Sequence, residues 1–257
     1  MTGLSFVAVT ALVKYLGDRI PPAESAFLRY LLGLVFLIPM ASSLRRARVT
    51  PKLWLLFASR GMVAVTVEYR VESKHHSTPV DAFEDAQMAM LWMRHNHASL
   101  GIDPDRIIAA GAASGAHMAL SLAMQPEIME IDGYNPRPQG VIALSALVNT
   151  TRKGMESERF PDAKTASKQS PSSHVRKGLP PSLFLHGKSD TIVPHEHVAK
   201  LAKMLKRKKN QCELVDFEAA NHSFFNFNVS AKHFEIVLNS MDAFVSDLGY
   251  IEPMDYA

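Results

Sequence analysis

Residues 103–117 read DPDRIIAAGAASGAH, and this stretch decides the fold. The apolar run from Arg106 to Gly111 predicts a buried strand, and the small residues that follow it open a helix. Small side chains are needed at such a turn because the strand and the helix approach each other closely. We therefore expect a strand, a tight turn and a helix, with the turn presenting its side chain at the carboxyl end of the strand.

Strands and helices alternate around this stretch. A helix is expected from about Val80 to His97, because apolar side chains recur there every three or four residues and give one buried face. Further strands are expected at Met62–Tyr69, Gly140–Leu147, Ser182–His186 and Cys212–Phe217. Since helices separate the strands, the sequence predicts an α/β fold with a mostly parallel sheet and flanking helices.

Two other strand ends carry polar side chains. The segment LFLHGKSDTIVP, residues 183–194, presents Asp190 in a turn after its strand, and FEAANHSFFN, residues 217–226, presents His222. Because ligands bind at the carboxyl ends of parallel strands, we expect both groups near the turn at Ala113.

These three motifs, in this order, resemble the α/β-hydrolase superfamily in its esterase/lipase branch. The resemblance covers residues 58–257 and is similar to carbohydrate or acetyl esterases; shorter matches occur at Ala58–Met62, Glu68–Arg70, Glu84–Ala86 and Gly101–Arg106. It implies an α/β-hydrolase fold, no cofactor, and a mechanism in which His222 takes the proton of a serine while Asp190 orients the imidazole.

The turn departs from the pattern that the resemblance implies, which is Gly-x-Ser-x-Gly with a histidine four residues after the serine. Counting from Arg106, or back from His117, places that serine at Ala113, whose methyl group cannot accept an acyl group. Ser114 is the candidate substitute nucleophile, although a shift of one residue points its hydroxyl in another direction unless the turn moves. The alternative role for Ser114 is to supply its backbone N–H to the oxyanion.

A second departure concerns the other oxyanion donor, which in this family comes from a His-Gly-Gly loop. No such loop precedes the strand that ends at Tyr69, so we expect the N-terminal strands to be missing or substituted by an apolar N-terminal segment. Leu34–Pro39 is a candidate replacement strand, with Pro51–Ser59 as the helix after it.

Residues 1–50 differ in character, being apolar and transmembrane-like. This stretch carries Lys14, Ile20–Pro22, Glu24, Phe27–Arg29, an apolar run and Pro39, and with these residues it resembles a fragment of a drug/metabolite transporter. Their uncharged runs are shorter than the roughly 20 residues that span a bilayer. The segment is therefore too short to transport anything, and membrane association through residues 1–44 stays open. We place the truncated hydrolase domain at residues 58–257.

Composition narrows the partners. A net charge of +3 is too small to indicate nucleic-acid binding. The single cysteine, Cys212, fits a reducing compartment, so we expect the hydrolase part in the cytoplasm. The histidines outside the motifs lack the carboxylate or cysteine partners of a metal site, and no metal is expected.

The sequence thus predicts a carboxylic-ester hydrolase by resemblance, acting on short acyl or acetyl esters, with carbohydrate esters included. Its site is expected to be impaired by Ala113 and by the absent loop. One alternative is a catalytically dead hydrolase-like domain that binds a ligand or partner, tethered to a membrane. Another is a join between two unrelated coding segments, and the oligomeric state stays open.

Overall fold

A parallel sheet forms the centre of the part of the chain that the structure describes. The structure, a computed structural model, describes residues 61–253. Within them the strands follow the order β1-β2-β3-β4 and all pair in parallel: β1 Ile108–Ala112, β2 Gly140–Leu144, β3 Ser182–Gly187 and β4 Cys212–Phe217. The predicted α/β arrangement is confirmed.

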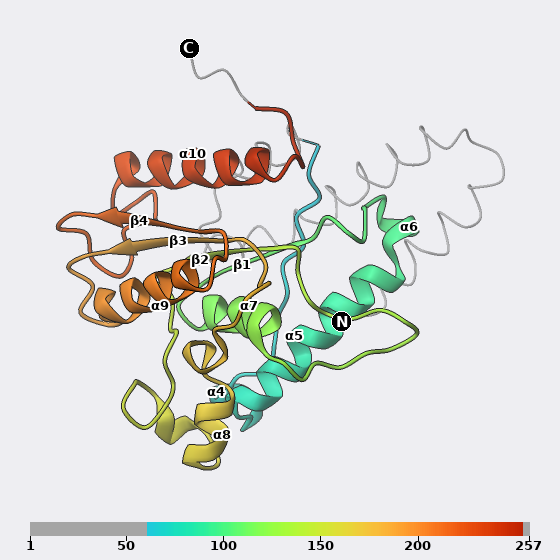
Figure 1. Cartoon of the computed structure of the whole chain (residues 1–257), viewed down its shortest axis with the longest axis horizontal. Coiled ribbons are helices and arrows are strands. Elements are labelled where there is room, and N and C mark those ends of the chain that lie inside the picture. Colours follow the sequence, from blue (N-terminus) through green and yellow to red (C-terminus); the bar gives the residue numbers. More distant parts are fainter. Residues whose placement is uncertain (1–60, 254–257) are drawn as a thin grey trace. The chain divides into compact units, whose positions relative to one another are not determined.

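Helices cover both faces of this sheet (Figure 1). Helix α10 (Ala231–Asp247) lies on one face, whereas α7 (Ser114–Met124) and α9 (His195–Arg207) lie on the other, and α5 (Pro79–His95) packs against α7. The shorter helices are α4 Glu72–His75, α6 His97–Leu100, η1 Ser157–Arg159, α8 Ala163–Lys168 and η2 Pro171–His174. This layering leaves the carboxyl ends of the strands free to carry loops.

The two central strands owe their position to their apolar sequences. Every residue of β2 and β3 is buried, as expected for parallel strands covered on both faces. They pack against α7 and α9 through one apolar cluster, to which Leu120, Phe184 and Leu201 contribute. The middle of the sheet is therefore held by neighbours on all sides.

Helix α5 begins and ends where its sequence dictates. Thr78 and Asp81 form a capping box, and Pro79 occupies the first turn, where its missing N–H costs nothing. The helix ends at His95, two residues before the predicted end, because the backbone leaves the helical region at Asn96.

The predicted strand Met62–Tyr69 is wrong, since these residues are in no strand of the structure. Val63, Val65 and Val67 are 50%, 44% and 37% exposed, as alternate residues of an unpaired segment would be. The physical reason lies in the missing neighbour. In residues 61–253, β1 pairs with β2 alone, so no strand is present to bond the segment on its inner side.

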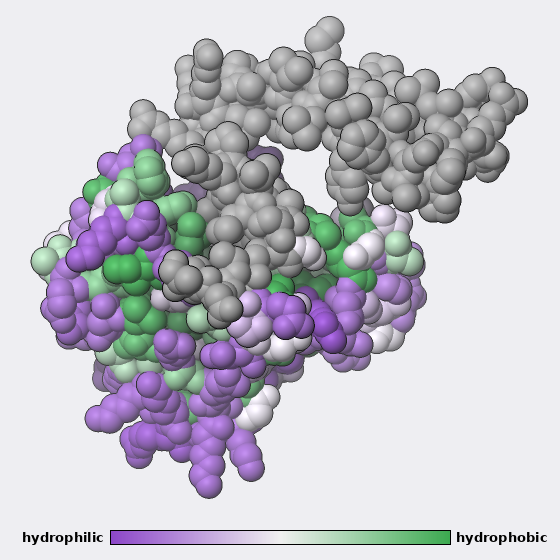
Figure 2. Space-filling model, turned by 90° about the horizontal axis from the view of Figure 1, so that it is seen from above, coloured by the Kyte–Doolittle hydropathy of each residue, from purple (hydrophilic) through white to green (hydrophobic). Residues whose placement is uncertain are grey.

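Several predictions concern residues outside the described range. The apolar segment 1–50, the replacement strand Leu34–Pro39 and the helix Pro51–Ser59 all lie there. Among residues 61–253, no helix has both the length and the apolar character needed to cross a bilayer. Hydrophilic and apolar side chains are interspersed on the face that Figure 2 shows.

Candidate active site

The turn between β1 and α7 has the geometry of a nucleophile elbow, and Ala113 stands at its tip. Ala113 adopts φ 50° and ψ −112°, a combination that costs free energy for any residue with a side chain. Its N–H donates to the carbonyl oxygen of Leu144, 3.0 Å away, which fixes the turn against the end of β2. The strained position thus falls on the residue that counting from Arg106 and His117 had indicated.

Gly111 explains why the turn needs small residues. A Cβ added at Gly111 would lie 2.3 Å from the carbonyl carbon of Gly115, so only glycine allows β1 and α7 to approach this closely. The strand-to-helix turn is therefore set by the sequence, although its tip carries a methyl group instead of a hydroxyl.

Ser114 is the first residue of α7 and is exposed. Its Oγ lies 3.2 Å from the hydroxyl of Tyr69, and either oxygen can donate. The backbone N–H of Ser114 belongs to the first helical turn, where N–H groups have no intrahelical acceptor and the helix dipole is positive. That N–H lies at the positive end of α7, whereas the side chain is bonded to Tyr69.

Asp190 and His222 meet at the other side of the site. His222 Nδ1 donates to Asp190 Oδ2 over 2.8 Å, which leaves Nε2 as the free acceptor of the ring. Asp190 Oδ1 accepts from the backbone N–H groups of Ile192 and Val193, both at 2.9 Å. Burial raises the pKa of Asp190, but the hydrogen bonds from Val193, His222 and Ile192 outweigh it and hold that pKa below its usual value. The carboxylate therefore stays charged and orients the imidazole.

Two residues that the sequence analysis left without a role support this pair. His186 is fully buried, and its Nε2 lies 2.9 Å from the carbonyl oxygen of Val193 and 3.2 Å from Asp190 Oδ2. Burial lowers the pKa of His186, so it braces Asp190 as a neutral ring. Ser145 donates its hydroxyl to the carbonyl oxygen of His222 at 2.8 Å. His186 stood inside the 183–194 motif, and its place just before the Gly-x-x-Asp turn was the available signal.

The carboxyl end of β2 connects the two sides of the site. Leu144 accepts the N–H of Ala113, and the next residue, Ser145, bonds the loop of His222. The same loop packs on the end of β3, because a Cβ added at Gly187 would lie 2.3 Å from the carbonyl oxygen of Ala220. Consecutive residues at one strand end therefore hold both Ala113 and His222.

His117, the histidine four residues after Ala113, is structural. It is buried, and its Nε2 lies 2.9 Å from the carbonyl oxygen of Gln169. Burial lowers its pKa to about 4, so the ring is neutral at pH 7 and ties α7 to the segment before η2.

A pocket of about 90 Å³ opens beside the elbow. Apolar and polar side chains both line it, and the polar groups include the Tyr69 and Ser114 hydroxyls and the buried, unbonded Oγ of Ser77. The apolar lining residues are Val71, Pro79, Ala82, Met118, Leu147 and Phe160, and the charged ones are Arg70, Glu72, Glu156 and Arg159. Such a pocket suits a small group that has both an apolar part and a polar part.

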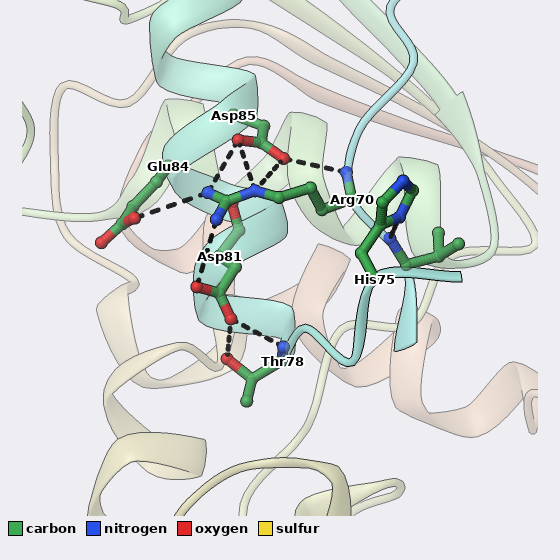
Figure 3. Close-up of polar contacts among 7 residues, drawn as sticks. Arg70, His75, Thr78, Asp81, Glu84 and Asp85 are labelled. Carbon is green, nitrogen blue, oxygen red and sulfur yellow. Dashed lines mark hydrogen bonds and ion pairs between the residues drawn. The ribbon is translucent and has the colours of Figure 1, made fainter. Parts of the chain in front are cut away.

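An arginine clamp holds the segment that carries Tyr69 against α5 (Figure 3). Arg70 donates to both carboxylate oxygens of Asp85 through Nε at 3.0 and 2.9 Å, and its backbone N–H donates to Asp85 Oδ2 at 2.8 Å. Asp81 and Glu84 lie farther from the guanidinium, at 3.5 and 3.7 Å. The hydrogen bond from Arg70 lowers the pKa of Asp85 below its usual value. The clamp ties the segment that carries Tyr69 to α5.

In the part of the chain that the structure describes, no group of three or more histidine, cysteine, aspartate or glutamate side chains is placed to hold a metal ion. Burial raises the pKa of the Cys212 thiol to about 11, which makes it a poor nucleophile.

Family models match two overlapping parts of the chain. One, described as BD-FAE, matches residues 43–151, and another, described as serine hydrolase (FSH1), matches residues 109–224. The transporter resemblance of residues 1–50 finds no support among the comparisons.

Curated relatives are esterases of Mycobacterium tuberculosis. The probable carboxylic ester hydrolase LipM is 26% identical over 176 residues, covering 60% of this chain and 40% of LipM. Esterase LipC is 25% identical over 190 residues, covering 65% of this chain and 46% of LipC. The chain thus spans less than half the length of these relatives.

Solved structures of Thermogutta terrifontis esterase 2 are also similar. The apo form has a TM-score of 0.72 and 34% identity, covering 77% of this chain and 76% of that one. The form phosphoramylated by tabun has a TM-score of 0.73 and 35% identity, with the same coverage. With this identity and coverage, and with an elbow, an acid and a histidine in the same sheet, the chain belongs to the α/β-hydrolase superfamily in its esterase branch.

Proposed function

We propose that this chain is a carboxylic-ester hydrolase for short acyl esters whose turnover is limited by Ala113. The observation that carries the proposal is the hydrogen bond of 2.8 Å between His222 and the buried Asp190, formed next to an elbow whose strained tip is Ala113. A surface histidine has no need of a buried carboxylate held by two backbone N–H groups. That arrangement suits a base that must bind a proton during a reaction.

The acid and base act on one proton. Asp190 keeps the Nδ1 proton on His222, so Nε2 is the acceptor, and the charged carboxylate stabilises the imidazolium that forms. The N-terminus of α7 supplies the Ser114 N–H and the positive end of its dipole to an oxyanion. What the site lacks is a hydroxyl at position 113, because the alanine methyl cannot form an acyl ester.

Short acyl groups are supported by the pocket and by a relative. The pocket beside Ser114 measures about 90 Å³, with Leu147 and Phe160 in its lining, and this small volume limits the length of the acyl chain that fits. Thermogutta terrifontis esterase 2 has been solved with propionate and with butyrate bound. We therefore assign acetyl to butyryl esters as the substrate class, including acylated carbohydrates.

The test restores the nucleophile. Ala113→Ser is expected to raise the hydrolysis of 4-nitrophenyl butyrate roughly 100-fold or more over the wild type, because acylation then becomes available. Ala112→Ser is the matched control, since it adds the same hydroxyl one residue before the tip and should change nothing. Ala113→Ser combined with His222→Ala should lose the gain. If Ala113→Ser folds and gains no activity toward any acyl ester, the proposal is wrong.

A further inference from the structure

The wild-type site retains a positioned base but presents no serine for that base to activate. Among the described residues, the His222 ring makes one hydrogen bond, through Nδ1 to Asp190. The Ser114 hydroxyl is bonded to Tyr69, and the buried Ser145 hydroxyl donates to the carbonyl oxygen of His222 instead of to its ring. Neither hydroxyl is therefore bonded to Nε2.

Solvent reaches this base. The His222 side chain is 21% exposed, whereas Asp190 behind it is fully buried. Alanine at position 113 lacks the one oxygen atom that a serine side chain would carry. A water molecule from solvent has the size of that missing hydroxyl and can act as a nucleophile. The strained backbone at the tip of the turn is kept. Ala113 still donates its N–H to the Leu144 carbonyl oxygen, and Ser145 donates its hydroxyl to the His222 carbonyl oxygen, so the end of β2 holds the elbow and the histidine together.

We propose that the wild-type chain hydrolyses activated esters by direct attack of water, with His222 as the general base, and forms no acyl-enzyme. This inference rests on the proposed function. The water oxygen bonds to the acyl carbon while His222 Nε2 takes one of its protons, and the carbonyl oxygen becomes an oxyanion. The carbon–oxygen bond to the leaving group then breaks. The proton returns from His222 to the leaving alcohol, which leaves a carboxylic acid and a neutral imidazole.

The substrate class follows from the weak oxyanion site. The Ser114 N–H at the start of α7 is the donor on this side, and the His-Gly-Gly loop that supplies the other is absent from the sequence. A missing donor costs on the order of 100-fold in turnover. Aryl and enol esters tolerate that loss because their leaving groups depart easily, whereas alkyl esters do not. Among the short acyl esters assigned above, the wild type should therefore hydrolyse those of phenols fastest, and alkyl esters, which include acylated carbohydrates, much more slowly.

Magnitudes set the expected rate. General-base catalysis by a positioned side chain contributes roughly 10²- to 10⁴-fold. With one oxyanion donor missing, we take the lower end of that range, about 100-fold, as the expected acceleration. The wild type should therefore accelerate 4-nitrophenyl acetate hydrolysis by that factor over buffer, which is measurable with purified protein at micromolar concentration.

The experiment compares wild type, His222→Ala, His222→Gln and His174→Asn as full-length chains. His174 is the control because its ring is bonded to the carbonyl oxygen of Lys168, at 2.6 Å, instead of to a residue of the site. We expect both His222 variants to fall to the buffer rate and His174→Asn to keep the wild-type rate. Product should appear without a burst, and intact mass of acid-quenched wild type should show no acetyl adduct.

Each contrary outcome has one meaning. A burst, or an acetyl group on Ser114, would replace water with a serine nucleophile and overturn the inference. If the His222→Gln variant keeps the wild-type activity, His222 is not the general base and the inference is overturned. A wild type at the buffer rate beside an active Ala113→Ser variant would reject the inference alone, whereas inactivity of both would reject the proposed function.

Discussion

The two sides of the site differ in how the fold supports them. Asp190 follows β3, which has a bonded strand on each side, and His222 follows β4, which pairs with β3 alone among the described residues. The elbow follows β1, which pairs with β2 alone among the described residues, and charged side chains of α5 hold the segment that carries Tyr69. The acid therefore follows a central strand and has its expected side chain, whereas the elbow follows an outer strand and carries an alanine.

This difference teaches that backbone geometry and chemistry can be lost separately. The turn at Ala113 keeps its strained φ of 50°, although no hydroxyl remains for that strain to present. Strain of this kind is usually tied to function, yet here packing alone maintains it, through Gly111 and through the N–H of Ala113 on Leu144. Because the strained turn is still present, the single substitution Ala113→Ser can restore a nucleophile at its tip.

The largest effect should come from filling the close contacts on the two sides. Gly187→Ala is expected to lower the free energy of unfolding by about 3 kcal/mol or more, because its Cβ would meet the Ala220 carbonyl in a sheet with no freedom to move. Gly111→Ala should cost less, about 1 to 2 kcal/mol, since β1 pairs with β2 alone among residues 61–253 and can shift more easily than β3. Urea unfolding measures both.

Gly115→Ala is the control for these substitutions, because nothing lies within 4 Å of the added Cβ. In the first turn of α7 it should be neutral or slightly stabilising. If Gly111→Ala proves costlier than Gly187→Ala, the edge of the sheet is the more rigid side and the comparison is reversed.

Acid should destabilise the fold through His117. Its pKa is about 4 in the folded chain and near 6.5 when unfolded, so the unfolded state binds the proton first as the pH falls. Stability is then lost between about pH 6.5 and 4, by up to about 3 kcal/mol from this residue. His117→Gln should flatten the dependence of the urea midpoint on pH in that window.

Asp190 titrates in a different window. Its folded pKa lies below its usual value, so its contribution is present above about pH 4 and is lost as the pH falls further. Asp190→Asn removes the charge that raises the pKa of His186, so the slope between pH 4 and 6.5 should become slightly steeper and should not vanish. A slope in that window that persists in His117→Gln and vanishes in Asp190→Asn would reassign the acid sensitivity.

The smallest effect should come from the arginine clamp. Asp85→Asn weakens the bidentate contact with Arg70, which lies at the surface, so global stability should barely change. Local opening of residues 61–71 should increase, and trypsin should cleave there faster by roughly fivefold or less. Glu84→Gln is the matched control, because its contact with Arg70 is 3.7 Å long. If trypsin cleaves both variants at the same rate, the contact between Arg70 and Asp85 does not hold this segment.

Much of this could be read from the sequence. The four paired strands, the order of the motifs and the strained position at Ala113 follow from apolar runs and from spacing to Gly111 and His117, which are local properties. The strand Met62–Tyr69 failed because pairing depends on a neighbour, and no neighbour is present in residues 61–253. The bracing of Asp190 by His186 and of His222 by Ser145 also escaped, since a hydrogen bond between loops leaves no periodic signal.

The most direct test of the account is covalent labelling of the elbow with paraoxon, followed by intact and peptide mass spectrometry. We predict that Ala113→Ser takes up one diethyl phosphate group at residue 113, that adding His222→Ala to it abolishes the uptake, and that the wild type takes up none. Labelling of the wild type at Ser114, or an Ala113→Ser variant that folds but stays unlabelled, would contradict the claim that Ala113 stands where this fold presents its nucleophile.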